Sequence, residues 1–457
     1  MKLPVTIGAA LAIVLLTGAA GPDQRPVKIG VLTDMTSIYA EHAGPGSVEA
    51  ARMAIEDFGG SVLGKPIELV FADHRNDPGL GMSIAQRWYG EGVDALADVG
   101  NSAVALAVEQ ISRQAKRIVL FSGPASAELT GPNCSPYAVD WTYDTYAMAH
   151  GTANAIVRSG GNSWFFITAD YTFDYAMERD AGNVIRSEGG IVLGSVKVPV
   201  GLIDFSQYLL QAKTSRAKII GLAIAGQEMI SAIKQASEFS IVQDGQRLAG
   251  LLVFITDVHS LGLERAQGLL MTSAYYWDQN DKTRAWAERF FSKMKRMPTM
   301  VQAGVYGAIT HYLKAVQATG SNDADTVMMK MREMPINDFM THDGKLRIDG
   351  RVMRDMYLFE VKNPPSRNIR GTISSCCRPF QRTRPSGPWM KVAVLSCPRD
   401  DSEATQEDER GSHDGTVLCS LKCLAANVAA IVLLPEPDSP ITTITDGSIS
   451  LCLRGRM

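Results

Sequence analysis

The sequence predicts an α/β protein built from two doubly wound lobes. From Val27 to Ala274, short apolar runs typical of buried strands alternate with runs whose apolar residues recur at helical spacing. Such alternation is typical of right-handed βαβ crossovers and of parallel sheets covered by helices on both faces. The candidate strands are many for one sheet, and a chain of 457 residues is longer than one hydrophobic core usually organises. We therefore expect the lobes to divide at Asp140–Tyr146, where the sequence DWTYDTY interrupts the alternation.

The expected elements follow one another along the chain. The candidate strands are VKIGVL, IELVFAD, ALADVG, RIVLFSG, SWFFITA, IVLGSVKV, KIIGLAIAG, LLVFIT and GLLMTSAY. A first helix ends at Phe58 and carries Val48, Ala51 and Ile55 on one apolar face. The later helices are expected at Ser102–Ala115, Tyr175–Ser187, Phe205–Thr214, Glu228–Phe239, Ala285–Met294 and Gln302–Thr319. A polar pair of strands, GKLRIDG and RDMYLFEVK, is expected to follow them.

Residues 1–20 have the three parts of a secretory signal peptide. Lys2 supplies a positive charge, Val5 to Leu16 form an apolar core, and Gly18, Ala19 and Ala20 are small residues suited to cleavage. The core is too short to span a membrane comfortably, and no Cys follows it that could carry a lipid. A buried N-terminal helix is the alternative, but the order of charge, apolar core and small residues favours an exported protein.

Composition and motifs argue against several classes of function. The 45 basic and 48 acidic side chains nearly cancel, giving a formal net charge of −3 and no field that would attract nucleic acid. The seven histidines include no pair at the spacing of metal ligands. Ser231 and Lys234 have a Ser-x-x-Lys spacing, but they fall within an expected helix without companion motifs. We expect no enzyme, no catalytic residues, no metal and no cofactor.

Polar and aromatic residues gather where the expected strands end, which is where open α/β sheets bind ligands. Hydroxyls, small residues and helix N-termini suit a carboxylate, aromatic rings supply apolar walls, and an acid can pair with an ammonium group. Together they predict a site for a small zwitterion between the two lobes. The clusters are Thr33–Tyr39, Asn101-Ser102, Ser122–Ser126, Trp141–Tyr146, Thr168–Phe173, Ala225–Gln227, Thr256–Asp257 and Tyr275–Asp278.

At these clusters the sequence resembles the periplasmic substrate-binding proteins of ABC importers, of the branched-chain amino acid (leucine-binding) type. The resemblance covers Val27 to about Ser366 and includes GVLTDMTSIYA, GPGSVEAARMAIEDFGG, NSAVALAVEQ, TADYTFDYAMERD and PTMVQAGVYGAITHYLKAV. It implies a periplasmic-binding-protein type I fold, with two lobes, a hinge cleft and three crossover strands. It also implies a monomer in the periplasm that binds a small amino acid or related carboxylate and presents it to a membrane ABC permease.

The resemblance assigns roles to residues of the first lobe. Tyr39 matches the aromatic residue of the first loop that covers the ligand. Ser102 matches the hydroxyl that binds the ligand carboxylate. Ala125 and Ser126 match the pair that holds the head group of an amino acid, although this loop is one residue shorter than the leucine-binding pattern.

Two further roles fall in the second lobe. Tyr171 matches an aromatic residue of the site, and Asp257 stands where the leucine-binding branch has a Glu for the ligand ammonium. The shorter Asp, and Ala225-Gly226 where that branch has aromatic residues, leave amino acids, aromatic acids and amides as alternative ligands. A ligand-sensing module of a receptor or regulator is the alternative function, although no linked transmembrane or helix-turn-helix segment is recognisable.

Other residues near the clusters have structural alternatives. Ser102 and Asp257 would alternatively cap the helices that follow them, and Tyr39 and Tyr171 would be aromatic residues of a lobe surface. Gln302 and Tyr306 are further candidates to face the cleft. Packing at the hinge or between the lobes, rather than ligand contact, is expected for Trp141, Tyr143, Tyr146 and Trp277.

The chain changes character at Ser366. Codons permitted for Ser366–Phe380, read from their third base, encode Glu-Lys-Tyr-Pro-Trp-Asp-Tyr-Phe-Lys-Leu-Leu-Ser-Thr-Ile, which matches the continuation of the family pattern. We therefore expect a frameshift at or just before Ser366 and an out-of-frame, disordered tail at residues 367–457. The segments expected before it are lobe 1 at 27–146 and 278–346, lobe 2 at 147–277, and a truncated completion of lobe 2 at 347–366.

The cysteines agree with this interpretation, because six of the seven follow residue 370. Proteins of the family often end with a Cys, and the resemblance implies that Cys134 normally pairs with it. The expected frameshift removes that partner and leaves Cys134 single.

Overall fold

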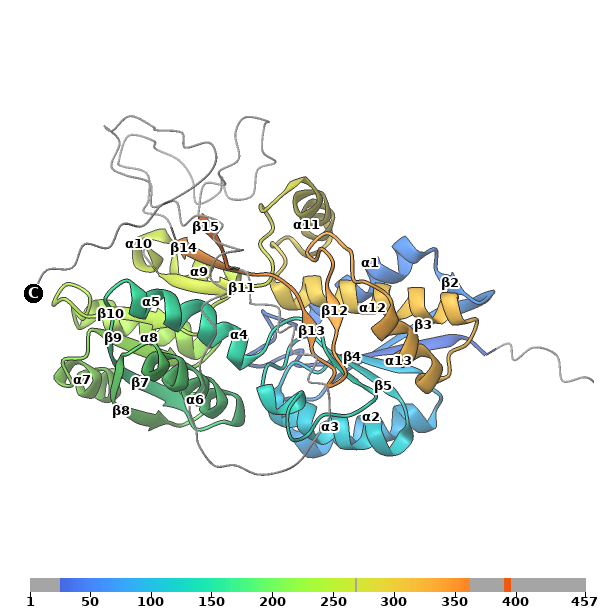
Figure 1. Cartoon of the computed structure of the whole chain (residues 1–457), viewed down its shortest axis with the longest axis horizontal. Helices are drawn as coiled ribbons and strands as arrows, with labels where there is room; N and C mark the ends of the chain where they lie inside the picture. The colour runs from blue at the N-terminus through green and yellow to red at the C-terminus, as the bar shows by residue number, and fades with distance from the viewer. Residues whose placement is uncertain (1–24, 268, 362–389, 396–457) are drawn as a thin grey trace, which may run out of the picture. The chain divides into compact units, whose positions relative to one another are not determined.

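The computed structural model describes residues 25–267, 269–361 and 390–395. It contains two separate parallel sheets, which confirms the expected pair of doubly wound lobes (Figure 1). The expected signal peptide at residues 1–20 lies outside the described residues, as does most of the expected out-of-frame tail. Within the described part of the chain, no helix has the length and apolar character needed to cross a membrane.

The first sheet has six strands in the order β2-β3-β1-β4-β5-β6. All neighbours are parallel except β2 and β3, which form an antiparallel hairpin. The short strands β2 and β6 were not predicted. The strands are β1 (Val27–Thr33), β2 (Ser61–Val62), β3 (Lys65–Asp73), β4 (Ala95–Asp98), β5 (Ile118–Phe121) and β6 (Ala138–Asp140).

Helices cover both faces of this sheet because its central strands are apolar on both sides. Ile29 and Val31 of β1 lie in one core with α1 and α12, whereas Leu32 lies in a second core with α2 and α3. Asp77 and Asn101 cap α2 and α3 by accepting from backbone amides in their first turns. The helices of this lobe are α1 (Gly44–Phe58), α2 (Pro78–Gly90), α3 (Ser102–Ala115), α11 (Asp281–Met294), α12 (Met300–Thr319) and α13 (Ala324–Glu333).

The second sheet has four parallel strands in the order β10-β9-β7-β8. Trp164 and Phe166 of β7 pack with α6 on one face, and Ile220 and Leu222 of β9 pack with α7, α8 and α9 on the other. Its strands are β7 (Ser163–Ala169), β8 (Ile191–Val198), β9 (Ile219–Ala223) and β10 (Arg247–Gly250). Its helices are α4 (Thr145–Ala149), α5 (Ala155–Arg158), α6 (Thr172–Ser187), α7 (Ser206–Thr214), α8 (Gln227–Glu238), α9 (Ile255–Leu261) and α10 (Leu263–Ala266), with a π-helical turn η2 (His150–Asn154) between α4 and α5.

One predicted strand is wrong. The run LLVFIT was expected to be a strand, but β10 ends at Gly250, and the buried residues Leu251 to Phe254 form an irregular segment before α9. An apolar run at a strand end has the same composition as the strand itself, so composition alone does not separate the two. Two residues of this segment, Leu252 and Phe254, line the pocket described below.

The two strands GKLRIDG and RDMYLFEVK do not pair with each other as predicted. β12 (Lys345–Leu346) pairs with the unpredicted β13 (Val352–Met353), not with the RDMYLFEVK strand. That strand is β14 (Met356–Val361), which lies between β11 (Leu270–Ser273) and β15 (Met390–Leu395) in an antiparallel sheet. β15 falls in the tail that was expected to be disordered. Its sequence MKVAVL is rich in strand-forming residues, and the edge of β14 was open to accept it.

Arg351 links two of the segments that run between the lobes. Its Nε atom lies 2.7 Å from Asp144 Oδ2, and its Nη1 donates to the backbone oxygen of Asp140 at 3.2 Å. Asp140 N in turn donates to Gly350 O at 2.8 Å. These contacts join the chain after β6 to the chain before β14. Among the described cysteines, Cys134 is free and exposed.

Candidate ligand-binding site

The order of the strands places two switch points opposite each other. In the first sheet β1 lies between β3 and β4, and in the second sheet β7 lies between β8 and β9. The strands that follow β1 and β7 in the chain are therefore added on both sides of them, which is the definition of a switch point. A pocket lies at the carboxyl ends of these strands, with about 400 Å³ of space that is free of protein atoms and partly open to solvent. Its lining residues are Tyr39, His42, Ala43, Gly100, Asn101, Ser102, Gly123, Pro124, Ala125, Tyr143, Tyr171, Phe173, Ala225, Leu252, Phe254 and Val301.

The loop after β1 places Tyr39 in the lining of the pocket, and its role of covering a ligand stays a prediction. Asp34, which is fully buried, organises this loop: its Oδ2 accepts from Tyr39 N at 2.9 Å and from Asn76 Nδ2 at 2.9 Å. Burial alone would raise the pKa of Asp34, but these hydrogen bonds and those from Ser37 lower it overall. Asp34 therefore stays ionised and holds the loop. Burial raises the pKa of the Tyr39 phenol well above its usual value, so its hydroxyl remains a donor.

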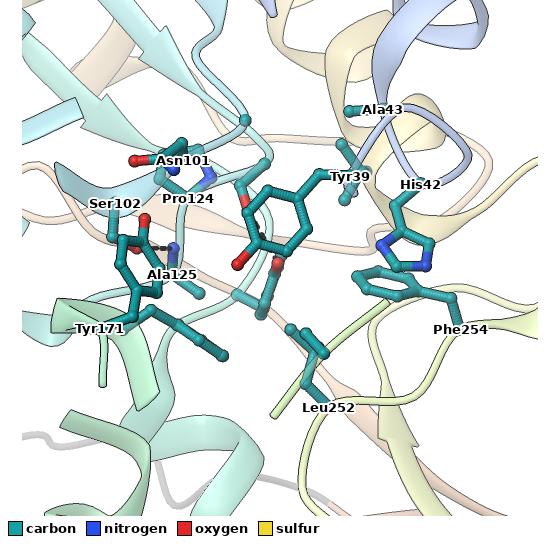
Figure 2. Close-up of a pocket in the computed structure, with 16 residues that line it drawn as sticks. Tyr39, His42, Ala43, Asn101, Ser102, Pro124, Ala125, Tyr171, Leu252 and Phe254 are labelled. Carbon is teal, nitrogen blue, oxygen red and sulfur yellow. Dashed lines mark hydrogen bonds between the residues drawn. The ribbon is translucent and has the colours of Figure 1, made fainter. Parts of the chain in front are cut away.

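The N-terminus of α3 forms the polar end of the pocket. Ser102 begins the helix, and its Oγ accepts from Ala125 N at 3.3 Å (Figure 2). Both residues line the pocket, and their contacts with a ligand stay predictions. The loops after β4 and β5 approach closely here, since a Cβ on Gly123 would lie 2.6 Å from the Cα of Gly100. Backbone amides at a helix N-terminus, together with the Ser102 hydroxyl, are suited to bind a carboxylate.

Tyr171, from the loop after β7, reaches this polar end from the other lobe. Its hydroxyl accepts from Ala103 N at 3.2 Å. Burial raises the pKa of its phenol, although hydrogen bonds with Ala103 and Ser102 act in the opposite direction. The protonated hydroxyl can therefore still donate to a ligand. Tyr171 lines the pocket, and its contact with a ligand stays a prediction.

Asp257 does not line the pocket, in contrast to its expected role at a ligand ammonium. Its Oδ1 lies 2.9 Å from His42 Nε2, and its Oδ2 accepts from Phe254 N at 2.8 Å. Asp257 is 1% exposed, so both oxygens are committed to the protein. The residue that faces the pocket at this point is His42, whose ring stacks on Phe254 at a centroid distance of 4.1 Å.

Ser126 is also absent from the lining. It is fully buried and caps the short 3-10 helix η1 (Ala127–Leu129), where its Oγ accepts from Glu128 N at 3.4 Å. Of the two further candidates, Gln302 is buried and donates through Nε2 to Ala43 O at 3.2 Å, outside the pocket. Tyr306 donates to Asp57 Oδ2 at 2.7 Å on the surface of the first lobe.

The aromatic residues expected to pack at the hinge fall in different places. Trp141 is fully buried, with the guanidinium of Arg354 over its ring at 5.4 Å. Tyr146 is 54% exposed. Trp277 lines a second, separate pocket. Tyr143, by contrast, lines the candidate site, and its hydroxyl donates to Gly123 O at 2.8 Å.

Sequence reasoning missed several residues of the lining, among them His42, Leu252 and Phe254, and it did not single out Asp34 within the cluster Thr33–Tyr39. Leu252 and Phe254 lie in the LLVFIT run, whose composition predicts a strand, so their apolar character points to a sheet and not to a pocket. His42 was considered only as a metal ligand. Its position three residues after Tyr39, in the loop that follows a strand, is the signal that would have placed it in the site.

No formal negative charge faces the pocket from the described residues that line it, since these include no Asp or Glu. Two acids lie buried nearby in the second lobe, Asp174 and Glu228, which are 2% and 3% exposed. Burial raises the pKa of both, and the repulsion from Glu228 raises that of Asp174 further. Among the described residues no group of three His, Cys, Asp or Glu side chains could hold a metal ion.

The fold and the site define a solute-binding protein of the type that serves ABC importers. A family model described as periplasmic binding protein matches residues 26–367. The chain therefore belongs to the periplasmic binding protein family.

Known relatives agree with this assignment. A periplasmic binding protein from Burkholderia mallei is 44% identical, with a TM-score of 0.75, over 81% of this chain and 95% of that chain. A branched-chain amino acid ABC transporter periplasmic ligand-binding protein from Burkholderia xenovorans LB400 is 37% identical, with a TM-score of 0.70, over 81% of this chain and 94% of that chain. A Leu/Ile/Val-binding protein homolog 3 from Brucella melitensis is 22% identical over 74% of this chain and 89% of that protein.

Proposed function

We propose that this protein binds a small organic carboxylate with a flat, apolar body and delivers it to an ABC permease. The observation that carries the proposal is the distribution of polar groups in the pocket. The hydroxyls of Ser102 and Tyr171 converge at one end, where each accepts from a backbone amide and keeps its own O–H group to donate, whereas aromatic rings, including Tyr39 and Phe254, form the walls. A ligand carboxylate at the first end would receive charge-assisted hydrogen bonds.

The arrangement supports capture by closure of the two lobes. Tyr39 and His42 belong to the first lobe, whereas Tyr171 and Phe254 belong to the second, so a ligand between them would bridge both. Closure removes water from the carboxylate and strengthens its hydrogen bonds. A permease that recognises the closed form would then receive only loaded protein. We place this monomeric protein in the periplasm, with residues 1–20 acting as its export signal.

An α-amino acid is the competing ligand class, because the names of the Burkholderia xenovorans and Brucella relatives refer to branched-chain amino acids. Against it stands the absence of an ionised acid from the described pocket lining, because an ammonium group needs such a partner when it leaves water. A protein of the same fold from R. palustris, 18% identical, was solved in complex with benzoate. This fold can therefore enclose an aromatic carboxylate.

A thermal-shift screen tests the proposal. Benzoate and phenylacetate are compared with leucine, phenylalanine and benzamide. The two amino acids add an ammonium group beside the carboxylate, whereas benzamide replaces the carboxylate with a neutral amide. A carboxylate present at 100 times its Kd should stabilise the protein by about 2.7 kcal/mol. We expect the acids to raise Tm and benzamide to have no effect, because it lacks the charge that α3 would bind. A shift with the amino acids alone would contradict the proposal.

A further inference from the structure

The imidazole of His42 is held in one orientation by two contacts of its ring, and a third contact fastens its backbone. Its Nε2 lies 2.9 Å from Asp257 Oδ1, and its ring stacks on Phe254 with an interplanar angle of 27°. Its backbone oxygen accepts from Thr299 Oγ1 at 2.7 Å, which fastens the loop to the N-terminus of α12. His42 is 4% exposed. An imidazole positioned this firmly has little freedom to turn away from the pocket.

The contact with Asp257 determines which ring nitrogen carries the proton. A carboxylate accepts a hydrogen bond, so Nε2 is the protonated nitrogen of the neutral ring, and Nδ1 is then an acceptor. Nδ1 has no hydrogen-bond partner within the described part of the chain, and Figure 2 shows one ring nitrogen of His42 directed toward Tyr39. The pocket therefore has an acceptor on the side opposite Ser102 and Ala125.

Gly226 leaves the space that this imidazole requires. A Cβ at Gly226 would lie 3.4 Å from His42 Cε1 and 2.7 Å from Ile38 O. A larger residue would push the first loop and its imidazole out of position. The inward position of His42 therefore depends on the small size of Gly226.

We infer that His42, positioned by Asp257, determines specificity by accepting a hydrogen bond from a donor on the ligand at the end away from its carboxylate. The ligand class is then an aromatic acid with a ring hydroxyl. This inference rests on the proposed function, because the carboxylate must be held at α3 for the ring substituent to reach His42. An unsubstituted ring would leave Nδ1 buried without a partner, which is the basis of discrimination by a hydrogen-bonding site.

The test uses ligand pairs of nearly equal size. Calorimetry on the full chain compares 3- and 4-hydroxybenzoate with 3- and 4-methylbenzoate, which place a methyl group where the hydroxyl would be. For the unaltered protein we expect at least one hydroxybenzoate to bind at least tenfold more tightly than its methyl partner. His42→Phe keeps a ring that can stack on Phe254 but removes the acceptor, so the preference should fall to twofold or less.

Asp257→Asn tests the positioning role separately. Asn can still accept from Phe254 N, but it no longer fixes the tautomer of His42, so the preference should fall while the affinity for methylbenzoates stays within about threefold. If His42→Phe does not fold because it leaves Asp257 unpaired, the double variant with Asp257→Asn removes that buried charge. A preference retained without His42, or absent from the unaltered protein, overturns the inference while the proposed function stands. Failure of all four acids to bind overturns the proposed function and this inference with it.

Discussion

The hydroxyl of Tyr171 accepts a hydrogen bond from Ala103 N at 3.2 Å. These two residues belong to different lobes: Tyr171 follows β7, and Ala103 lies in the first turn of α3. The contact therefore exists only while the lobes are together at the pocket. It also places a phenol at the helix terminus that is expected to hold the ligand carboxylate.

Tyr171→Phe should weaken ligand binding about fivefold. The change removes one hydrogen bond from the closed form, which is worth about 1 kcal/mol, and it removes a donor to the ligand. Calorimetry measures the change in Kd. Tyr175→Phe is the matched control, since Tyr175 lies in the first turn of α6, just after Tyr171, and its exposed hydroxyl donates to Asp170 outside the pocket. Equal losses in the two variants would contradict a specific role for Tyr171.

Ser102→Ala should weaken binding by roughly 10- to 150-fold, because hydrogen bonds to a charged group contribute about 1.5–3 kcal/mol. Ser112→Ala provides the comparison. Ser112 is a buried serine of the same helix whose Oγ donates to Arg117 O, away from the pocket. It should lower the free energy of unfolding with no change in Kd. An unchanged Kd for Ser102→Ala would exclude its hydroxyl from the carboxylate site.

The sequence was informative wherever local pattern decides structure. Ser102 and Tyr39 were found because they follow apolar runs that end at one edge of a sheet. Asp257 was misplaced for the opposite reason, because its role depends on His42, a residue 215 positions away in the chain. No local pattern encodes a contact between two lobes. The same limit explains the error at Phe254. The composition of its apolar run predicts a strand, whereas Phe254 lies in a wall of the pocket.

Gly226→Ala should weaken ligand binding more than it destabilises either lobe. Gly226 has φ of +64°, and an added Cβ would meet Ile38 O of the other lobe at 2.7 Å. Gly189 has φ of +80° with no atom within 4 Å of its Cβ position, so Gly189→Ala is a control that adds a Cβ at a positive φ without a steric contact. We expect a raised Kd for Gly226→Ala only. Similar Kd values for both variants would show that the loop does not need this close approach.

Glu109 of α3 should make the protein less stable as pH rises. Its side chain is fully buried, and burial raises its pKa from 4.5 to about 8. Between these values the folded state keeps a proton that the unfolded state has lost, so the folded state binds more protons. The free energy of unfolding must then decrease from about pH 4.5 to pH 8, by at most about 1.4 kcal/mol per pH unit from this group.

Glu109→Gln removes the titrating group while it keeps the size of the side chain. Urea unfolding at pH 5.5 and pH 8.5 should therefore show a smaller loss of stability for Glu109→Gln than for the unaltered protein. Glu91→Gln is the control, because the Glu91 side chain is 61% exposed and should leave the difference between the two pH values unchanged. If Glu109→Gln has the same pH dependence as the unaltered protein, Glu109 is ionised in the folded state, and the cost of its burial is offset by Arg113, the nearby charge that lowers its pKa.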